Sequence, residues 1–216
     1  MRSRTILFLF LVAVGSPGFA GSSSPSGAGA EVVREMNLAR QRPDIYAGYL
    51  EELRGRFRGN ILVLPGNTLL RTHEGLGAVE DAIRFLRHQS PLAALAFSEG
   101  ISKAAAEHVA EQANGSFGHQ GSDRSEPGER MNRHGAWSGR WGENISYGKS
   151  NARDIVIALI IDDGLRGRKH RKNIFNPEFK VAGAAMGPHA RFRTVCSIDF
   201  AGGYVEAASP SLFAGN

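Results

Sequence analysis

Apolar residues recur three and four positions apart in several stretches of the chain, a spacing that predicts amphipathic helices. Proline lacks the amide hydrogen that a helix interior needs, so Pro43 is expected to interrupt the first of them. Ser98 is a typical N-cap, and Asn114 with Gly115 ends the helix that follows it. The predicted helices cover residues 31–52, 74–88, 99–113, 127–133 and 152–163.

Two apolar stretches near the carboxyl end predict β-strands. Residues 181–186 and 192–200 are rich in aliphatic and aromatic side chains, and Gly187 and Pro188 fall between them. This arrangement predicts a β-hairpin with its turn at residues 187–190. Helices that come first and strands that come later indicate an α+β domain with helices packed on an antiparallel sheet.

Two other segments show neither periodicity. Residues 62–66 are bounded by turn residues and are interpreted as a connector. Residues 115–148 are rich in Gly, Ser and Asn, and such a long stretch inside a compact domain is usually functional or disordered. Trp137 and Trp141 lie within it, and this aromatic content favours the functional interpretation.

The first twenty residues have the composition of a secretory signal. Arg2 and Arg4 form a basic start, and residues 6–14 are mostly apolar. An apolar run of about ten residues is short of the roughly twenty that span a bilayer, which favours a cleaved leader over a membrane anchor. We therefore expect export, with cleavage at Ala20 or at the later candidate Ala30.

The remaining chain is predicted to hold one domain. Residues 21–30 are rich in Gly and Ser and are interpreted as a flexible segment. The full chain has 216 residues, of which 42% are hydrophobic and 22% charged, enough for one well-packed core. The folded domain is expected over residues 31–216. Its single cysteine, Cys196, excludes an intramolecular disulfide and lies in an apolar run that predicts a buried, inert thiol.

Charge adds little to this picture. The formal net charge is +5, and it falls to +3 when Arg2 and Arg4 are removed with the leader. Such a mild excess gives no support for a polyanionic partner. The strongest local cluster is Arg166, Arg168, Lys169, Arg171 and Lys172. Export argues against nucleic acid as its partner. We expect some of these side chains to be solvated and Arg171, with Asn173, to make local structural contacts, and binding of anionic envelope lipid or polysaccharide is the secondary alternative.

Two histidines and two acids form the richest chemical signal. His119 lies in GHQGSD, Glu143 in GENIS, and Asp162 and His170 in IDDGLRGRKHR. They are separated by 24, 19 and 8 residues, so no short metal-binding motif applies. Imidazoles and carboxylates are ligands for Zn²⁺ and are also the groups that move protons near neutral pH. If folding brings the four together, they mark the functional site.

Further motifs accompany these residues in a definite order. Arg130 lies in PGERMNRHG, and the run RKHRKNIFNPEFKVAGAAMG contains His170. In this order the chain resembles the CAP superfamily, which includes cysteine-rich secretory proteins, venom antigens, plant pathogenesis-related proteins and single-domain prokaryotic relatives. The resemblance extends over residues 31–204 and is most specific over residues 95–200.

The resemblance implies an α+β fold, a three-layer α-β-α sandwich whose cleft holds two histidines and two acids. Matched position by position, His119, Glu143 and His170 are three of the four. The last acid usually follows a helical tryptophan by three positions. A leucine takes the place of that tryptophan here, which makes Asp162 the matching acid and Asp163 the alternative.

Two other positions depart from the family pattern. Arg124 stands where a glycine is common, and Lys169 stands where the family has the glycine of its GHR motif. A lysine beside His170 would repel a bound cation. Both positions, which favour glycine in the family, carry long cationic side chains in this chain.

Three functions remain open for the quartet. The four side chains would hold Zn²⁺ or another divalent cation, with water completing the site. Without a metal, the carboxylates would fix the imidazole tautomers in a purely structural network. Hydrolysis would need a metal-activated water with Glu143 or Asp162 as base, or else Ser122 or Ser146 as nucleophile, for which no nucleophile motif is present.

We therefore expect an exported CAP-domain protein, a binding protein more than an enzyme. Its cleft is expected to take a divalent metal and an unidentified lipid, peptide or envelope glycan, and no nucleic acid. No transmembrane anchor is expected after the leader is cleaved. A secreted metal-dependent hydrolase and a structural extracellular module are the alternatives.

Overall fold

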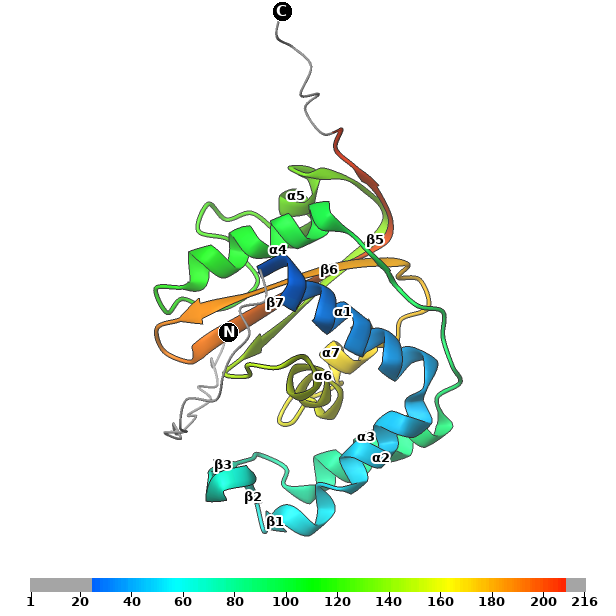
Figure 1. Cartoon of the computed structure of the whole chain (residues 1–216), viewed down its shortest axis with the longest axis vertical. Helices are drawn as coiled ribbons and strands as arrows, with labels where there is room; N and C mark the ends of the chain where they lie inside the picture. The colour runs from blue at the N-terminus through cyan, green and yellow to red at the C-terminus, as the bar shows by residue number, and fades with distance from the viewer. Residues whose placement is uncertain (1–24, 209–216) are drawn as a thin grey trace, which may run out of the picture.

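A four-stranded sheet forms the middle layer of the structure, a computed structural model that describes residues 25–208 (Figure 1). The strands are β4 (Ala96–Phe97), β5 (Gly135–Tyr147), β6 (Val181–His189) and β7 (Arg193–Glu206). Their order is β4-β6-β7-β5, in which β4 runs parallel to β6 and the other pairs are antiparallel. The predicted antiparallel sheet is therefore mixed, although only the two-residue strand β4 departs from it.

Helices cover both faces of the sheet (Figure 1). On one face lie α4 (Glu99–Gln112) and α5 (Pro127–Asn132). The other face carries α1 (Pro25–Gln41), α6 (Ala152–Ile161) and α7 (Lys169–Ile174), with α2 (Pro43–Glu51) and α3 (Leu76–His88) beyond them. The α+β fold is thus a three-layer α-β-α sandwich, as predicted.

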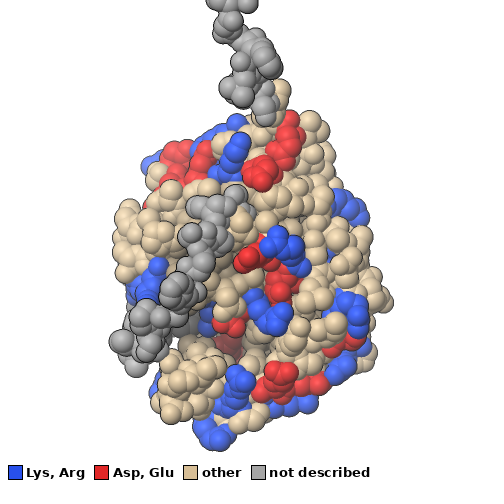
Figure 2. Space-filling model, in the orientation of Figure 1, with Lys and Arg blue, Asp and Glu red and all other residues tan. Residues whose placement is uncertain are grey.

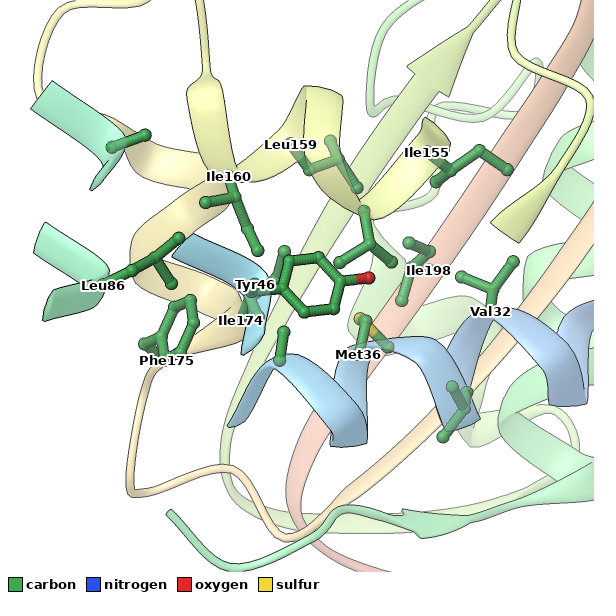
Figure 3. Close-up of a cluster of buried hydrophobic side chains, with 14 of the residues drawn as sticks. Val32, Met36, Tyr46, Leu86, Ile155, Leu159, Ile160, Ile174, Phe175 and Ile198 are labelled. Carbon is green, nitrogen blue, oxygen red and sulfur yellow. The ribbon is translucent and has the colours of Figure 1, made fainter. Parts of the chain in front are cut away.

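Alternation along the strands explains the two apolar layers, because successive side chains of a strand point to opposite faces. Ala182 and Ala184 of β6 join the core that contains α1, whereas Ala185 packs with residues of α4. Figure 3 shows Met36, Tyr46 and other side chains of the larger core gathered between helices and sheet. Cys196 lies in this core with no exposed surface, and burial raises the pKa of its thiol to about 12.

The predicted helical periodicities correspond to real helices. Pro43 separates α1 from α2, and it occupies the first turn of α2, where proline is tolerated. The Ser98 side chain accepts a hydrogen bond from the Ile101 amide at 3.1 Å and so caps α4. The short helix predicted over residues 127–133 is α5.

The amino-terminal boundary differs from the prediction. Residues 1–20, the predicted signal peptide, lie outside the described residues. The flexible segment predicted over residues 21–30 is wrong for its second half, because α1 begins at Pro25. Gly29 explains the difference: a Cβ there would overlap the Ala184 carbonyl of β6, so glycine allows α1 to lie directly against the sheet.

Three further segments were not predicted correctly. Residues 115–148 contain the thirteen-residue strand β5 as well as α5. The hairpin between β6 and β7 turns at residues 190–192 and not at 187–190, because the strands stay paired as far as His189 and Arg193. Helix α7 was also missed.

No helix among residues 25–208 is both long and apolar enough to cross a membrane.

A second, small sheet replaces the predicted connector at residues 62–66. It consists of β1 (Phe57–Arg58), β2 (Ile61–Val63) and β3 (Leu69–Arg71), all antiparallel. Two 3-10 turns, Arg54–Arg56 and Pro65–Asn67, flank these strands. The sheet lies beside α2 and α3, away from the central sheet (Figure 1).

Replacing Gly29 with alanine tests the close approach of α1 to β6. We expect the free energy of unfolding in urea to fall by about 1–3 kcal/mol, because the added methyl group overpacks the contact with Ala184. Gly77→Ala is the matched control: no atom lies within 4 Å of the place that a Cβ would occupy at this helical glycine, so a neutral or slightly stabilising effect is expected. Equal stability of the two variants would show that α1 does not pack there.

Candidate functional site

Strand β5 carries the candidate site on two adjacent residues. It is an edge strand, paired with β7 on one side only. Glu143 and Asn144 follow each other along it, so their side chains point to opposite faces of the sheet. Gly142 precedes them, and a Cβ there would lie 2.9 Å from the Phe179 ring. The small residue therefore lets the segment behind β5 approach the strand closely.

Glu143 and His119 form the first of two histidine–acid pairs. The Nδ1 atom of His119 lies 2.6 Å from Oε2 of Glu143. The acid side chain is 1% exposed, whereas the imidazole is 54% exposed. A buried carboxylate thus holds an imidazole whose other edge faces solvent.

Arg130 of α5 holds this pair in place through hydrogen bonds to Glu143 and to the His119 backbone. Its Nη2 donates to Oε1 of Glu143 at 2.7 Å, and the Ser197 hydroxyl donates to the same oxygen at 3.0 Å. Its Nη1 donates to the carbonyls of Ser125 and His119 at 2.9 and 3.1 Å. One wholly buried guanidinium therefore positions both the acid and the backbone of its histidine.

Asp162 and His170 form the second pair. Asp162 ends α6 in the left-handed conformation, with φ 55° and ψ 44°. Its Oδ1 lies 2.8 Å from Nδ1 of His170, and its Oδ2 accepts from the His170 amide at 2.9 Å. The acid side chain is 3% exposed and the imidazole 22%. The pair thus has the same form as the first, with both carboxylate oxygens committed to the histidine.

Two asparagines join the pairs through β5. Asn144 donates to the His170 carbonyl at 3.0 Å. Asn173, one turn further along α7, donates to the Asn144 side chain at 2.9 Å and to the Glu143 carbonyl at 3.2 Å. Both histidine–acid pairs are consequently attached to neighbouring residues of one strand.

The geometry separates Asp162 from the alternative Asp163. The Asp163 carboxylate accepts from the amides of His73 and Glu74 at 2.7 and 2.8 Å, so it anchors the start of α3 and not a histidine. Arg168 adds to this anchor by donating to both Glu74 oxygens and to the Asp162 carbonyl. The Arg168 guanidinium lowers the pKa of Glu74 to about 2.

The two positions that depart from the family pattern behave differently. Arg124 has φ 71°, a left-handed conformation that favours glycine. The arginine is accommodated at this position, but its backbone is strained. Lys169 is the exposed first residue of α7, and the left-handed residue at that bend is Arg168, with φ 51°.

Each imidazole of the site uses its Nδ1 for a carboxylate, which leaves its Nε2 available for a ligand. In a neutral ring whose Nδ1 donates to a carboxylate, Nε2 keeps its lone pair. No partner of either Nε2 lies within hydrogen-bonding distance among residues 25–208. In the same residues, no three His, Cys, Asp or Glu side chains are grouped so that they could hold a metal ion. The two Nε2 atoms are therefore the available protein ligands, with the acids behind them.

The serines considered as nucleophiles have other roles. The Ser122 hydroxyl donates to Oε1 of Glu111 at 3.1 Å, and its amide donates to the same carboxylate. Ser146 is buried on β5. Within residues 25–208, no hydrogen bond joins either serine to a histidine. Neither serine therefore has the histidine partner that a serine nucleophile would need.

Asp199 is a site residue that sequence reasoning missed. It lies on β7 directly across from Glu143 and is wholly buried. No protein donor within residues 25–208 satisfies either of its oxygens. Burial and the negative charge of Glu143 raise its pKa well above the ordinary value, which favours the neutral acid, able to donate to Glu143. The available signal was an acid between Ile198 and Phe200 in an apolar strand.

Asp199→Asn tests this assignment by pH. Because the pKa is raised in the folded state, the folded protein keeps a proton that the unfolded chain has lost, and the free energy of unfolding falls as pH rises above about 3.9, the ordinary value. The variant, always neutral, should lose this part of the pH dependence and equal or exceed wild-type stability at neutral pH. Urea titrations at several pH values measure it. The exposed control Glu52→Gln should leave the profile unchanged, and an unchanged profile in Asp199→Asn would contradict the assignment.

The fold and the site define a class: an α-β-α sandwich with two buried acids that each hold an imidazole through its Nδ1. The family model described as "CAP: Cysteine-rich secretory protein family" matches residues 80–200, more than half of the chain and all four of these side chains. The chain therefore belongs to the CAP family. No curated protein sequence matches it.

Three solved structures are similar to the chain. An extracellular protein containing an SCP domain from Bacillus anthracis is 21% identical with a TM-score of 0.41, covering 57% of this chain and 38% of its own. An outer surface protein from Borrelia burgdorferi is 16% identical with a TM-score of 0.44, covering 58% and 89%. A cysteine-rich secretory protein from Staphylococcus aureus is 13% identical with a TM-score of 0.37, covering 59% and 38%. The chain thus spans well under half of the Bacillus and Staphylococcus proteins.

Proposed function

We propose that the protein is an exported binding module that captures a divalent cation between its two outward imidazoles. The observation that carries this proposal is the hydrogen bonding that His119 and His170 have in common: each has Nδ1 on a buried carboxylate and Nε2 without a protein partner among residues 25–208. This carboxylate–histidine arrangement is the usual one behind metal-binding imidazoles, where the acid fixes the tautomer and makes the ring a better ligand. Imidazole nitrogen suits Zn²⁺ and other borderline transition-metal cations better than it suits Mg²⁺ or Ca²⁺.

The proposed site differs from a direct four-ligand site. Oε1 of Glu143 accepts from Arg130 and Ser197, and both oxygens of Asp162 accept from His170. The acids thus act behind the imidazoles, and a cation held by two nitrogens keeps positions open for water or for an anionic group of a ligand. Such a site favours binding over a closed structural role.

An adjacent apolar surface supports a ligand with an apolar part. Phe117 is 50% exposed and lies two residues before His119 in the same loop. A lipid, a peptide or an envelope glycan with an anionic group would contact the cation, and the aromatic ring would contact its apolar portion. The partner class therefore stays as expected from the sequence, with the metal as the proposed anchor.

Zinc titration by calorimetry tests the cation site. Wild-type protein should bind one ion per chain, and His119→Ala and His170→Ala should each abolish that binding. Asp162→Asn should weaken it by about 10–100-fold, because the acid orients its imidazole without contacting the ion. His88→Ala, which removes an exposed histidine at the end of α3, is the control and should bind as wild type.

Two outcomes of the titration would contradict the proposal. Zinc affinity unchanged in both histidine variants would remove the site. Two ions per chain, one lost in each variant, would show two independent histidines and no shared cation.

Export itself has a structural consequence for the cleavage point. Cleavage after Ala30 would remove the first six residues of α1, including Gly29, which lies against Ala184. We therefore expect cleavage after Ala20, so that α1 stays whole. Intact-mass measurement of the protein recovered from the medium or the cell envelope should give a chain that starts at Gly21. A chain that starts at Glu31 would contradict this, and a chain that retains Met1 would contradict the cleaved leader.

A further inference from the structure

The small sheet β1–β3 has two faces of different composition. Strand register places Phe57, Leu62 and Leu70 opposite one another on one face. Leu62 is buried and Phe57 packs against the main core, so this is the inner face. The outer face carries the remaining strand residues, namely Arg58, Ile61, Val63, Leu69 and Arg71.

The outer face carries three aliphatic residues beside its two arginines, whereas an exposed sheet face is usually polar. Leu69 is 57% exposed, and Ile61 and Val63 are half-buried. At one edge a groove of about 330 Å³ opens between arginine and aliphatic side chains. It is lined by Gly55, Arg56, Arg58, Val63, Leu64 and Pro65. Aliphatic groups and cationic groups thus share one surface.

The arginines of this surface lie in a stretch of chain without acids. Residues 53–73 contain four arginines and no Asp or Glu. Arg54 pairs with Glu80 of α3, but within residues 25–208 no ion pair involves Arg56, Arg58 or Arg71. All three are exposed. In Figure 2 this end of the molecule is largely tan with blue side chains at its rim.

We propose that the outer face, with Arg56 beside it, docks on an anionic lipid bilayer. Basic side chains near a negatively charged membrane each contribute attraction, and exposed aliphatic side chains enter the boundary between headgroups and acyl chains. The phosphates of a nucleic acid would pair with the arginines, but Leu69 and Val63 would stay exposed to water. The combination of guanidinium groups outside ion pairs with protruding aliphatic groups fits lipid best.

This surface is separate from the histidine–acid pairs. It lies before residue 80, outside the segment that matches the CAP family model, whereas all four residues of the histidine–acid pairs lie within that segment. The proposal does not rest on the cation site, and neither test depends on the other.

Co-sedimentation with vesicles tests the docking surface. The full chain, purified in the same processed form for every variant, should bind mixed phosphatidylcholine and phosphatidylglycerol vesicles and not pure phosphatidylcholine. The triple variant R56Q, R58Q, R71Q should lower the partition coefficient about a hundredfold, at roughly fivefold per arginine. Leu69→Ser should lower it about threefold to tenfold without changing the salt dependence.

The matched control removes three exposed cations elsewhere. The variant R166Q, K169Q, K172Q has the same net charge as the triple variant and alters the basic cluster around α7. It should lose much less binding. Urea unfolding should confirm that all variants stay folded, as expected for exposed side chains.

Several results would overturn the proposal. They are equal losses in the two triple variants, a greater loss in the control, or no binding of wild type to anionic vesicles. Full competition by duplex DNA together with an unchanged Leu69→Ser variant would also overturn it, because attraction to any polyanion would then account for the binding.

Discussion

The site depends on one buried ion pair, between Arg130 and Glu143. Both side chains are almost wholly removed from water, and burying two charges costs several kcal/mol for each ion unless hydrogen bonds compensate. Here the guanidinium binds the Glu143 carboxylate and the carbonyls of Ser125 and His119. Removing either partner would leave a buried charge, at about 3–5 kcal/mol. The pair therefore fixes the orientation of His119, and it also joins α5 to the sheet.

The alternation of β5 extends this order to the second pair. Because Glu143 and Asn144 are adjacent, one strand anchors His119 on one face and the backbone of His170 on the other. Gly142 leaves the space in which Asn173 reaches the strand. The left-handed turn at Asp162 then presents both carboxylate oxygens to the start of α7. A loop and the first turn of α7 thus hold their histidines in the same way, each by a buried acid.

The sequence predicted the elements whose signal is local. Helical spacing, the Ser98 cap and Pro43 each act within a few residues, and they located most helices. Strand β5 was not predicted because its Gly, Ser and Asn content is typical of a loop. It is held as a strand by pairing with β7, which is distant in the sequence. The residues of the quartet were identified by their motifs, but the role of the acids stayed open between direct metal ligands and partners that fix the imidazole tautomers. It depends on Arg130 and on the left-handed turn at Asp162, which no spacing reveals.

The central claim is that buried acids hold both imidazoles with Nδ1 protonated and Nε2 bare. Long-range ¹H–¹⁵N NMR of the histidine rings, in mildly alkaline solution without added metal, tests it most directly, because the two tautomers give different nitrogen shifts. We predict the Nδ1–H tautomer for His119 and His170. The control is the exposed ring of His88, whose Nδ1 contacts the Arg84 carbonyl near the end of α3. Arg84→Gly should loosen this helix end, so we predict no fixed tautomer for His88 in that variant. An Nε2–H tautomer at His119 or His170 would contradict the claim.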